Sequence, residues 1–112
     1  MTTTVRAEAA VEELEVGAYT IPTDQPEADG TLAWDSTTIV VVHAHGGGES
    51  GLGYTYADVS TAKLVESKLA AIVTGRDAFS PQAVWEKMVE QTRNLGRPGI
   101  TSMAIAAVDT AL

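Results

Sequence analysis

The chain has 112 residues, a formal net charge of −8, 45% hydrophobic and 20% charged residues, and no cysteine. This length predicts one domain, and the absence of thiols excludes disulfides and cysteine metal sites within the sequence while permitting a reducing cytoplasm, where we expect the protein. Residues 1–59 hold ten acids against one base, so no basic patch can neutralise phosphates. Neither nucleic acid nor a membrane is therefore an expected partner; the longest apolar run, residues 39–42, is far too short to span a bilayer.

The beginning of the chain predicts an irregular stretch and then a strand. Residues 1–9 are rich in Thr and Ala, and we expect them to be frayed or disordered. Leu14, Val16 and Ala18 then alternate with polar or small residues, which is the two-residue period of a β-strand. We expect this strand to end at Pro22.

A long loop is predicted over residues 22–35. Two prolines, four acids and Gly30 fall within these fourteen residues, so both helix and strand are disfavoured. Loops of this length are usually functional lids or disordered segments. Its acids lack the spacing of a calcium-binding loop, and Trp34 at its end is read first as an anchor of the loop.

The next two segments predict an antiparallel hairpin. Residues 37–45 are rich in β-branched side chains, and Leu52, Tyr54 and Tyr56 alternate with small residues. Residues 46–51 between them match the letters of the dinucleotide fingerprint Gly-x-Gly-x-x-Gly. That fingerprint needs a helix to follow the glycines, whereas a strand follows here, so we interpret the glycines as a hairpin turn.

Two groups of side chains on these strands could carry chemistry. His43 and His45 lie two residues apart and share one face, where they could present imidazoles to zinc with Glu49, although two partly solvated histidines are the simpler interpretation. Tyr54 and Tyr56, followed by a carboxylate at Asp58, could form a wall over a ligand pocket or simply pack and face water. The sequence leaves both pairs of alternatives open.

The second half of the chain has the periodicity of helices. From residue 60 apolar residues recur every three to four positions as far as a stop at Gly75. Ser80 and Pro81 mark the start of a second helix that Gly96 closes. A third, Ala-rich helix from Ile100 has no terminating signal, which predicts that it packs on something larger. The expected fold class is α+β, with a three-stranded antiparallel meander followed by a layer of three or more helices.

This order of elements resembles the N-terminal capping domain of the mandelate racemase and muconate lactonizing enzyme family of the enolase superfamily. Three stretches carry the resemblance, which covers residues 10–112: residues 37–42 (Thr-Thr-Ile-Val-Val-Val), residues 51–58 (Gly-Leu-Gly-Tyr-Thr-Tyr-Ala-Asp) and, in the last helix, residues 104–112 (Ala-Ile-Ala-Ala-Val-Asp-Thr-Ala-Leu). The family's third stretch continues into a catalytic TIM barrel that this sequence does not contain.

The resemblance implies a non-catalytic cap whose partner is the TIM-barrel domain of the same parent chain. That barrel would bind Mg²⁺ and abstract a proton next to the carboxylate of a sugar-acid-like substrate in a racemase, dehydratase or cycloisomerase. Two segments of the cap would close over the pocket, and the residues expected to contact substrate are Asp24, Trp34, Tyr54, Tyr56 and Asp58. No catalytic or metal-binding residue, no cofactor and no turnover are expected of this chain alone.

The alternative is an autonomous α+β binding or oligomerisation module. In that case the Ala-rich last helix would be a self-association face. A homo-oligomer is expected under either interpretation.

Overall fold

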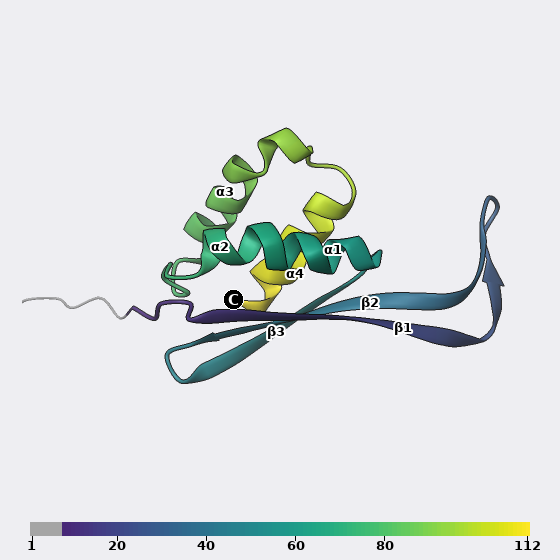
Figure 1. Cartoon of the computed structure of the whole chain (residues 1–112), viewed down its shortest axis with the longest axis horizontal. Coiled ribbons are helices and arrows are strands. Elements are labelled where there is room, and N and C mark those ends of the chain that lie inside the picture. The colour runs from purple at the N-terminus through teal and green to yellow at the C-terminus, as the bar shows by residue number, and fades with distance from the viewer. Residues whose placement is uncertain (1–7) are drawn as a thin grey trace, which may run out of the picture.

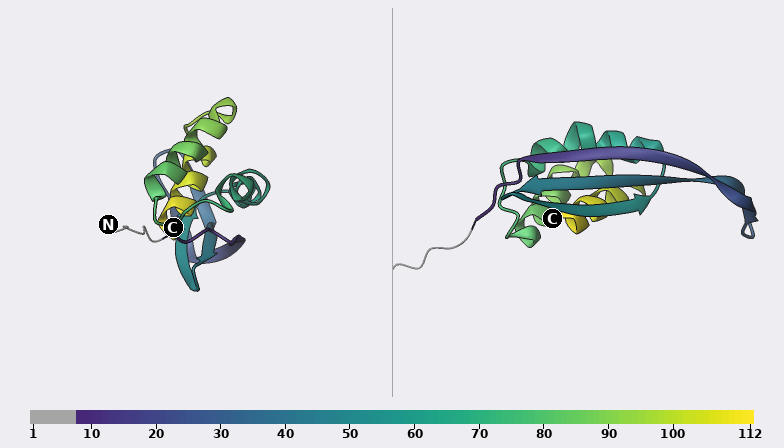
Figure 2. Two further views of the ribbon diagram at one scale, coloured as in Figure 1. Left: turned by 90° about the vertical axis from the view of Figure 1, so that its left-hand side faces the viewer. Right: turned by 90° about the horizontal axis from the view of Figure 1, so that it is seen from below.

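In the computed structural model, which describes residues 8–112, the chain forms a three-stranded antiparallel sheet with helices on one face (Figure 1). The strands are β1 (Glu13–Ala28), β2 (Ala33–Gly46) and β3 (Glu49–Tyr56), in the order β1-β2-β3. The other face of the sheet is left open, as the two further views make clear (Figure 2). The predicted α+β class and the antiparallel meander are confirmed.

The prediction of a loop over residues 22–35 is wrong, because β1 and β2 continue through these residues as a two-stranded ribbon. Ser36 still faces Pro22, and pairing resumes at Glu27 and Trp34 after a bulge in β1. Prolines are tolerated here because β1 is an edge strand, whose outward N–H groups need no partner within the sheet. The ribbon (residues 22–35) extends well beyond the helical layer (Figure 1).

An aspartate organises the tip of the ribbon. The Asp29 carboxylate accepts hydrogen bonds from the backbone N–H groups of Thr31 and Leu32, both at 2.7 Å, and the Asp29 N–H donates to the Leu32 carbonyl at 2.8 Å. These bonds hold the pKa of Asp29 below its usual value. Asp29 and the residues after it therefore form an Asx turn, and not part of a long open loop.

The helices form a layer over one sheet face. A first rod consists of α1 (Val59–Leu64), a π-helical segment (Val65–Leu69) and α2 (Ala70–Val73), and it ends at Gly75, which has φ = 90°. The helix α3 (Pro81–Gln91) begins with proline at its first turn, as predicted, and a 3-10 turn (Arg93–Leu95) follows it. The last helix is α4 (Ile100–Ala111), and no described helix is long and apolar enough to cross a membrane.

The core lies between the sheet and the helices. Every second side chain of β2 points inward at Val40, Val42 and Ala44. Val42 and Ala44 belong to one cluster with apolar side chains from all three helical units and from the N-terminal segment, namely Val11, Val65, Leu69, Val73, Val84, Met88, Ala104, Ile105, Ala107, Val108 and Ala111. The apolar surface predicted for α4 is partly accounted for by this core, since most of the apolar residues of α4 are already buried within the domain.

Glycines let α4 pack directly on the backbone of β3. A Cβ atom added at Gly53 would lie 2.8 Å from the Ala111 nitrogen and would overlap the Ala107 carbonyl oxygen, and one added at Gly51 would overlap the Ala111 carbonyl. Neither glycine has a positive φ. Glycine is therefore needed at these positions because no space is left for a side chain, and not because of the backbone conformation. The alternation seen in the sequence therefore places the small residues of β3 under the helix and the large ones on the open face.

The N-terminal segment is joined to the helical layer by backbone hydrogen bonds. The Val11 N–H donates to the Arg76 carbonyl at 2.8 Å, and the Ala78 N–H donates to the Ala9 carbonyl at 2.8 Å. Residues 1–7 of the stretch predicted to be frayed lie outside the described residues, whereas Ala9 is already held in place.

Candidate functional site

The ribbon and the β3–α1 junction lie at the same end of the sheet. Tyr56, the last residue of β3, pairs with Ile39, and the Ala57 N–H donates to the Thr38 carbonyl at 3.2 Å. From that row of the sheet, β1 and β2 run on into the ribbon (Figure 1). The two segments expected to contact substrate are thus neighbours in space, although they are about thirty residues apart in sequence.

The two tyrosines of β3 form a wall on the open face of the sheet. Tyr54 is 56% exposed and Tyr56 is 62% exposed, and their rings meet edge to face with centroids 6.0 Å apart. Val41 and Ile39 stand beside them on β2, and Tyr19 lies beyond Ile39 on β1. The side chains thus form an aromatic and aliphatic surface with phenol groups available at its edge.

Asp58 begins the first helix. Its carboxylate accepts hydrogen bonds from the Ser60 hydroxyl at 2.6 Å and the Ser60 N–H at 2.9 Å, which is the geometry of a helix N-cap. The hydroxyl bond is the main reason that the pKa of Asp58 lies below its usual value. The residue therefore positions the junction, and one of its carboxylate oxygens is engaged in doing so.

We expect the N-cap to make helix stability depend on pH. A lowered folded-state pKa means that the contribution of Asp58 is present above its unfolded pKa of 3.8 and is lost as the pH falls through the folded value. Asp58→Ala should lower the midpoint of thermal unfolding at pH 7. The midpoints at pH 7 and pH 3 should also differ less in this variant than in the parent sequence. Asp58→Asn is the matched variant, because it keeps the cap but does not titrate. Equal pH profiles for Asp58→Asn and the parent sequence would contradict the assignment.

Asp24 and Trp34 lie on the ribbon. Trp34 is 37% exposed, and its indole N–H donates to the Glu27 carboxylate across the two strands at 3.2 Å. Asp24 is exposed beside an open hollow formed by residues 22–27. The candidate residues thus form two groups at one end of the molecule, and the hollow of residues 22–27 is lined by Asp24 but not by Tyr54, Tyr56 or Asp58.

The histidines occupy the other half of the open face. Their rings are stacked with centroids 6.4 Å apart, and His45 Nδ1 lies 2.7 Å from the Ser50 hydroxyl while its Nε2 lies 3.1 Å from a Glu15 oxygen. The geometry of the Glu15 contact is not that of a hydrogen bond, so Nε2 has no hydrogen-bond partner. The sequence showed the shared face but not Glu15, which only the register of β1 on β2 brings opposite His43.

Among residues 8–112, no three His, Asp or Glu side chains are placed to hold a metal ion together. The zinc alternative for His43, His45 and Glu49 finds no support in this geometry. The described part of the chain likewise does not fit a Mg²⁺ ion. What the site offers is a protruding ribbon, an aromatic wall and a capped helix start.

Known proteins with similar sequences are enzymes of sugar acids. No model of a protein family matches the chain. A 3,6-anhydro-α-L-galactonate cycloisomerase from Streptomyces coelicolor is 32% identical over 108 residues, which are 91% of this chain and 30% of that protein. An L-rhamnonate dehydratase from Saccharopolyspora erythraea is 38% identical over 76 residues, which are 68% of this chain and 19% of that protein.

Solved structures agree with the sequence relatives. A mandelate racemase/muconate lactonizing enzyme-like protein from Rubrobacter xylanophilus is 63% identical, with a TM-score of 0.89 over 91% of this chain and 28% of its own. A racemase from Streptomyces coelicolor, solved with bound magnesium, is 30% identical with a TM-score of 0.86 over 90% of this chain and 30% of its own. L-talarate/galactarate dehydratase from Salmonella typhimurium, at 18% identity and a TM-score of 0.80, shares the fold.

The chain belongs to the mandelate racemase/muconate lactonizing enzyme family of the enolase superfamily and corresponds to its N-terminal domain. It spans about 30% of the length of the cycloisomerase that it matches, and 19% of the L-rhamnonate dehydratase. The resemblance first carried by residues 37–42, 51–58 and 104–112 is confirmed.

Proposed function

We propose that this domain caps the barrel active site of a Mg²⁺-dependent enzyme of the enolase superfamily and helps to select its substrate. The ribbon and the β3–α1 junction are the two elements that would close over the substrate. Closure would act by excluding water and by positioning the substrate, because the cap supplies surfaces rather than reacting groups.

One observation carries this proposal: the ribbon and the junction project from a single end of a rigid sheet. The strands of the ribbon are the same strands that hold Val40 and Val42 in the core, so its base is fixed. Its outer part, in contrast, has exposed side chains and no helix behind it. A two-stranded ribbon of this kind is marginally stable alone and gains order from what it contacts.

The names of the relatives support a sugar acid as the substrate. The matched enzymes are named for an anhydrogalactonate and for rhamnonate, both sugar acids. The exposed phenols of Tyr54 and Tyr56 and the indole of Trp34 suit the apolar and hydroxyl faces of such a molecule. The acids of the ribbon would repel the substrate carboxylate, so that carboxylate would be bound away from Asp24.

The metal and the remaining partners belong to the rest of the parent protein. The three carboxylates that would hold Mg²⁺ are expected in its TIM barrel, where the ion would stabilise the charge that develops next to the substrate carboxylate. The parent enzyme would act in the cytoplasm as a homo-oligomer, and sedimentation of the purified protein measures that state directly.

The test uses the full parent enzyme with a panel of sugar acids. We expect turnover that requires Mg²⁺, and we expect Trp34→Ala and Tyr56→Ala each to reduce kcat/KM by about 10- to 100-fold through misplacement of the substrate. Their melting temperatures should change little, because Tyr56 is 62% exposed and neither side chain belongs to the core. Leu95→Ala, an exposed residue near the far end of the helical layer, is the matched control and should leave kcat/KM unchanged.

Two outcomes separate the parts of this proposal. No Mg²⁺-dependent turnover with any carboxylate would reject the enzyme class. Turnover that is unaffected by Trp34→Ala and Tyr56→Ala would retain the class and reject these residues as substrate contacts.

A second candidate function is that of an autonomous association module. The observation that favours it is the open face of the sheet, where Tyr19, Leu52 and Tyr54 are each more than half exposed. Apolar surfaces of this kind mark interaction sites. Concentration-dependent association of the 112-residue chain that Leu52→Asp abolishes would support this function, and a monomer at all concentrations would oppose it.

A further inference from the structure

Two side chains of the ribbon are tied to each other across its strands. Trp34 on β2 and Glu27 on β1 are direct partners in the ladder, and the indole N–H donates to the Glu27 carboxylate at 3.2 Å. A carboxylate acceptor makes such a hydrogen bond stronger than one between neutral groups. The orientation of the Trp34 ring is therefore set by a residue that was not among the candidates from the sequence.

The bulge in β1 brings Glu27 opposite Trp34. Residues 23–26 form this bulge, and within it the Thr23 hydroxyl donates to the Gln25 carbonyl at 2.7 Å. Bulges near functional sites commonly re-aim a side chain. Because residues that are directly opposite in a ladder share one face, the side chain of Glu27 lies on the face of the ribbon that also carries Trp34.

Trp34 stands on the side of the sheet that carries the helices. β2 is unbroken, so Trp34 shares a face with Ser36 and with Val40, which is fully buried on the helical side. The tip of the ribbon bends towards that same side (Figure 1). The ring of Trp34 is thus presented on the side where α1 begins, at Val59, which is 60% exposed.

The bond to Glu27 decides which part of Trp34 is free to contact a ligand. An indole has one polar hydrogen, on Nε1, and no acceptor, and here that hydrogen is engaged. Trp34 is 37% exposed, so what it can offer to a ligand is its ring. The face of an aromatic ring is electronegative, and it attracts the C–H groups of a sugar and disfavours a carboxylate.

We propose that Glu27 is a positioning residue of the substrate site, and that it fixes the indole so that the ring face of Trp34 meets the carbon-bound hydrogens of the sugar acid. The inference rests on the proposed function, in which Trp34 contacts the substrate. It adds the residue that holds Trp34, and it assigns the part of the substrate that lies against the ribbon. Glu27 acts only through Trp34.

Two substitutions at Glu27 separate its hydrogen bond from its charge. Glu27→Ala removes the acceptor, whereas Glu27→Gln removes the charge and keeps an oxygen that can accept from the indole N–H. Asp35→Ala is the near control. Asp35 is exposed and follows Trp34 directly in sequence, but the alternation of β2 places it on the other face of the ribbon.

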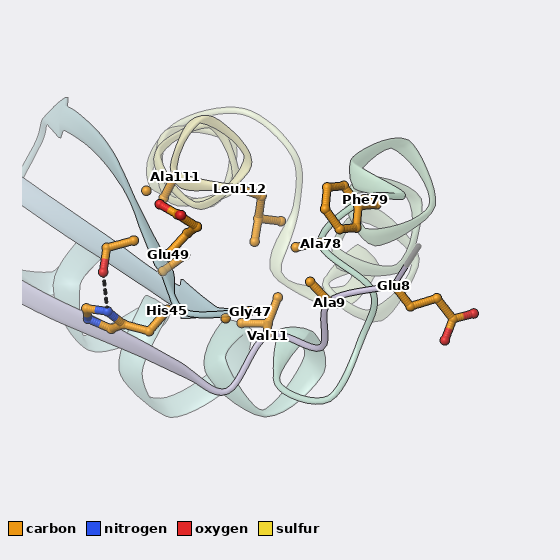
Figure 3. A pocket seen from close by; sticks show the side chains of 14 residues that line it. Glu8, Ala9, Val11, His45, Gly47, Glu49, Ala78, Phe79, Ala111 and Leu112 are labelled. Carbon is orange, nitrogen blue, oxygen red and sulfur yellow. Dashed lines mark hydrogen bonds between the residues drawn. The ribbon is translucent and has the colours of Figure 1, made fainter. Parts of the chain in front are cut away.

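Glu49→Ala is the control for the loss of an exposed acid far from the ribbon. Glu49 lies at the opposite end of the sheet, on the rim of a cavity of about 380 Å³ (Figure 3). This cavity opens between the N-terminal segment, the β2–β3 turn, the residues before α3 and the end of α4. Any effect that Glu27→Ala shares with Glu49→Ala comes from net charge and not from the position of the indole.

The first measurement is fluorine NMR of the full parent enzyme labelled with fluorotryptophan, without substrate. The Trp34 resonance is the one that Trp34→Phe removes. We expect Glu27→Ala to shift or broaden this resonance, Glu27→Gln to change it less, and the two controls to leave it in place. An unchanged resonance in Glu27→Ala would show that the carboxylate does not fix the ring, and would overturn the proposal.

The second measurement asks whether Glu27 acts through Trp34. Glu27→Ala should lower kcat/KM about tenfold through misplacement of the substrate, while Glu27→Gln and the two controls should stay within about threefold of the parent enzyme. In the Trp34→Ala background, Glu27→Ala should have no further effect, because residues that act as one unit are not additive. The same loss in both backgrounds would mean that Glu27 acts independently of Trp34, and the proposal would be wrong.

Failure of the proposed function and failure of this inference give different results. An enzyme without turnover, or one that Trp34→Ala leaves unaffected, rejects the proposed contact and with it the role of Glu27 in the substrate site. An enzyme that is impaired by Trp34→Ala but not by Glu27→Ala retains the proposed function and overturns this inference alone.

Discussion

Gly53→Ala is expected to cost about 3 kcal/mol or more of the free energy of unfolding, because the added methyl group overlaps the backbone of α4. A Cβ atom at this position would press on the Ala107 carbonyl oxygen and lie 2.8 Å from the Ala111 nitrogen. Backbone atoms of a helix cannot rotate away as a flexible side chain can, so α4 must shift as a unit. Urea unfolding of the 112-residue chain, followed by circular dichroism, measures the change.

Gly30→Ala is the matched control for this prediction. Gly30 lies at the tip of the ribbon, has no heavy atom within 4 Å of an added Cβ and does not have a positive φ. The same chemical change there should alter the unfolding free energy by less than about 1 kcal/mol and could raise it, since alanine restricts the unfolded chain. Similar losses at both positions would show that the close approach of α4 to β3 is not what Gly53 provides.

Leu69→Ala is expected to destabilise the chain by about 2–5 kcal/mol, because it leaves a cavity in the middle of the core. Leu69 is fully buried at the end of the π-helical segment, where it packs among side chains of the sheet and the other helices. The measurement is again the midpoint of urea unfolding, with an unchanged slope as evidence that the unfolded state is the same.

Leu32→Ala makes the same truncation on the ribbon, where the leucine is 68% exposed. Its effect should stay within about 0.5 kcal/mol, as for other surface substitutions. A large loss at Leu32 together with a small one at Leu69 would contradict the described core.

The compact part of the fold could be predicted because local and tertiary signals agree there. The β-branched run of residues 37–45 favours a strand, and the turn glycines Gly47 and Gly48 have the positive φ values that a tight hairpin needs. Gly75 and Pro81 end and begin helices for purely local steric reasons. Each of these signals acts over a few residues, which is why a single sequence reveals them.

The ribbon could not be predicted in the same way. Pro22 and Pro26 oppose a strand locally, and only the position of β1 at the sheet edge makes them harmless. The π-helical turn at residues 65–69 was also missed, because its extra residue per turn leaves the apolar spacing close to helical. In both cases the structure depends on which neighbouring group each backbone N–H or C=O contacts, and a single sequence does not reveal this.

That the candidate residues contact substrate stays a prediction, and the sequence alone showed only part of their geometry. The alternation of β3 correctly placed Tyr54 and Tyr56 on one face, and their edge-to-face contact follows from it. The role of Asp58 as a helix cap, made by its bonds to the Ser60 N–H and hydroxyl, was not predicted. In contrast, the contact of Glu15 with His45 depends on strand register, and the cavity at the end of α4 depends on four separate segments.

The ribbon has a consequence for how such enzymes can diversify. Its tip is a turn held by Asp29, and no residue beyond Pro22 on β1 contributes to the core. Each doubling of the length of a flexible loop costs only about 0.6 kcal/mol of closure free energy. Extra residues inserted near Gly30 would therefore change the free energy of unfolding of the domain little. Under the proposed function, new substrate preferences would then evolve by insertion and deletion at this tip, with the architecture that supports it left intact.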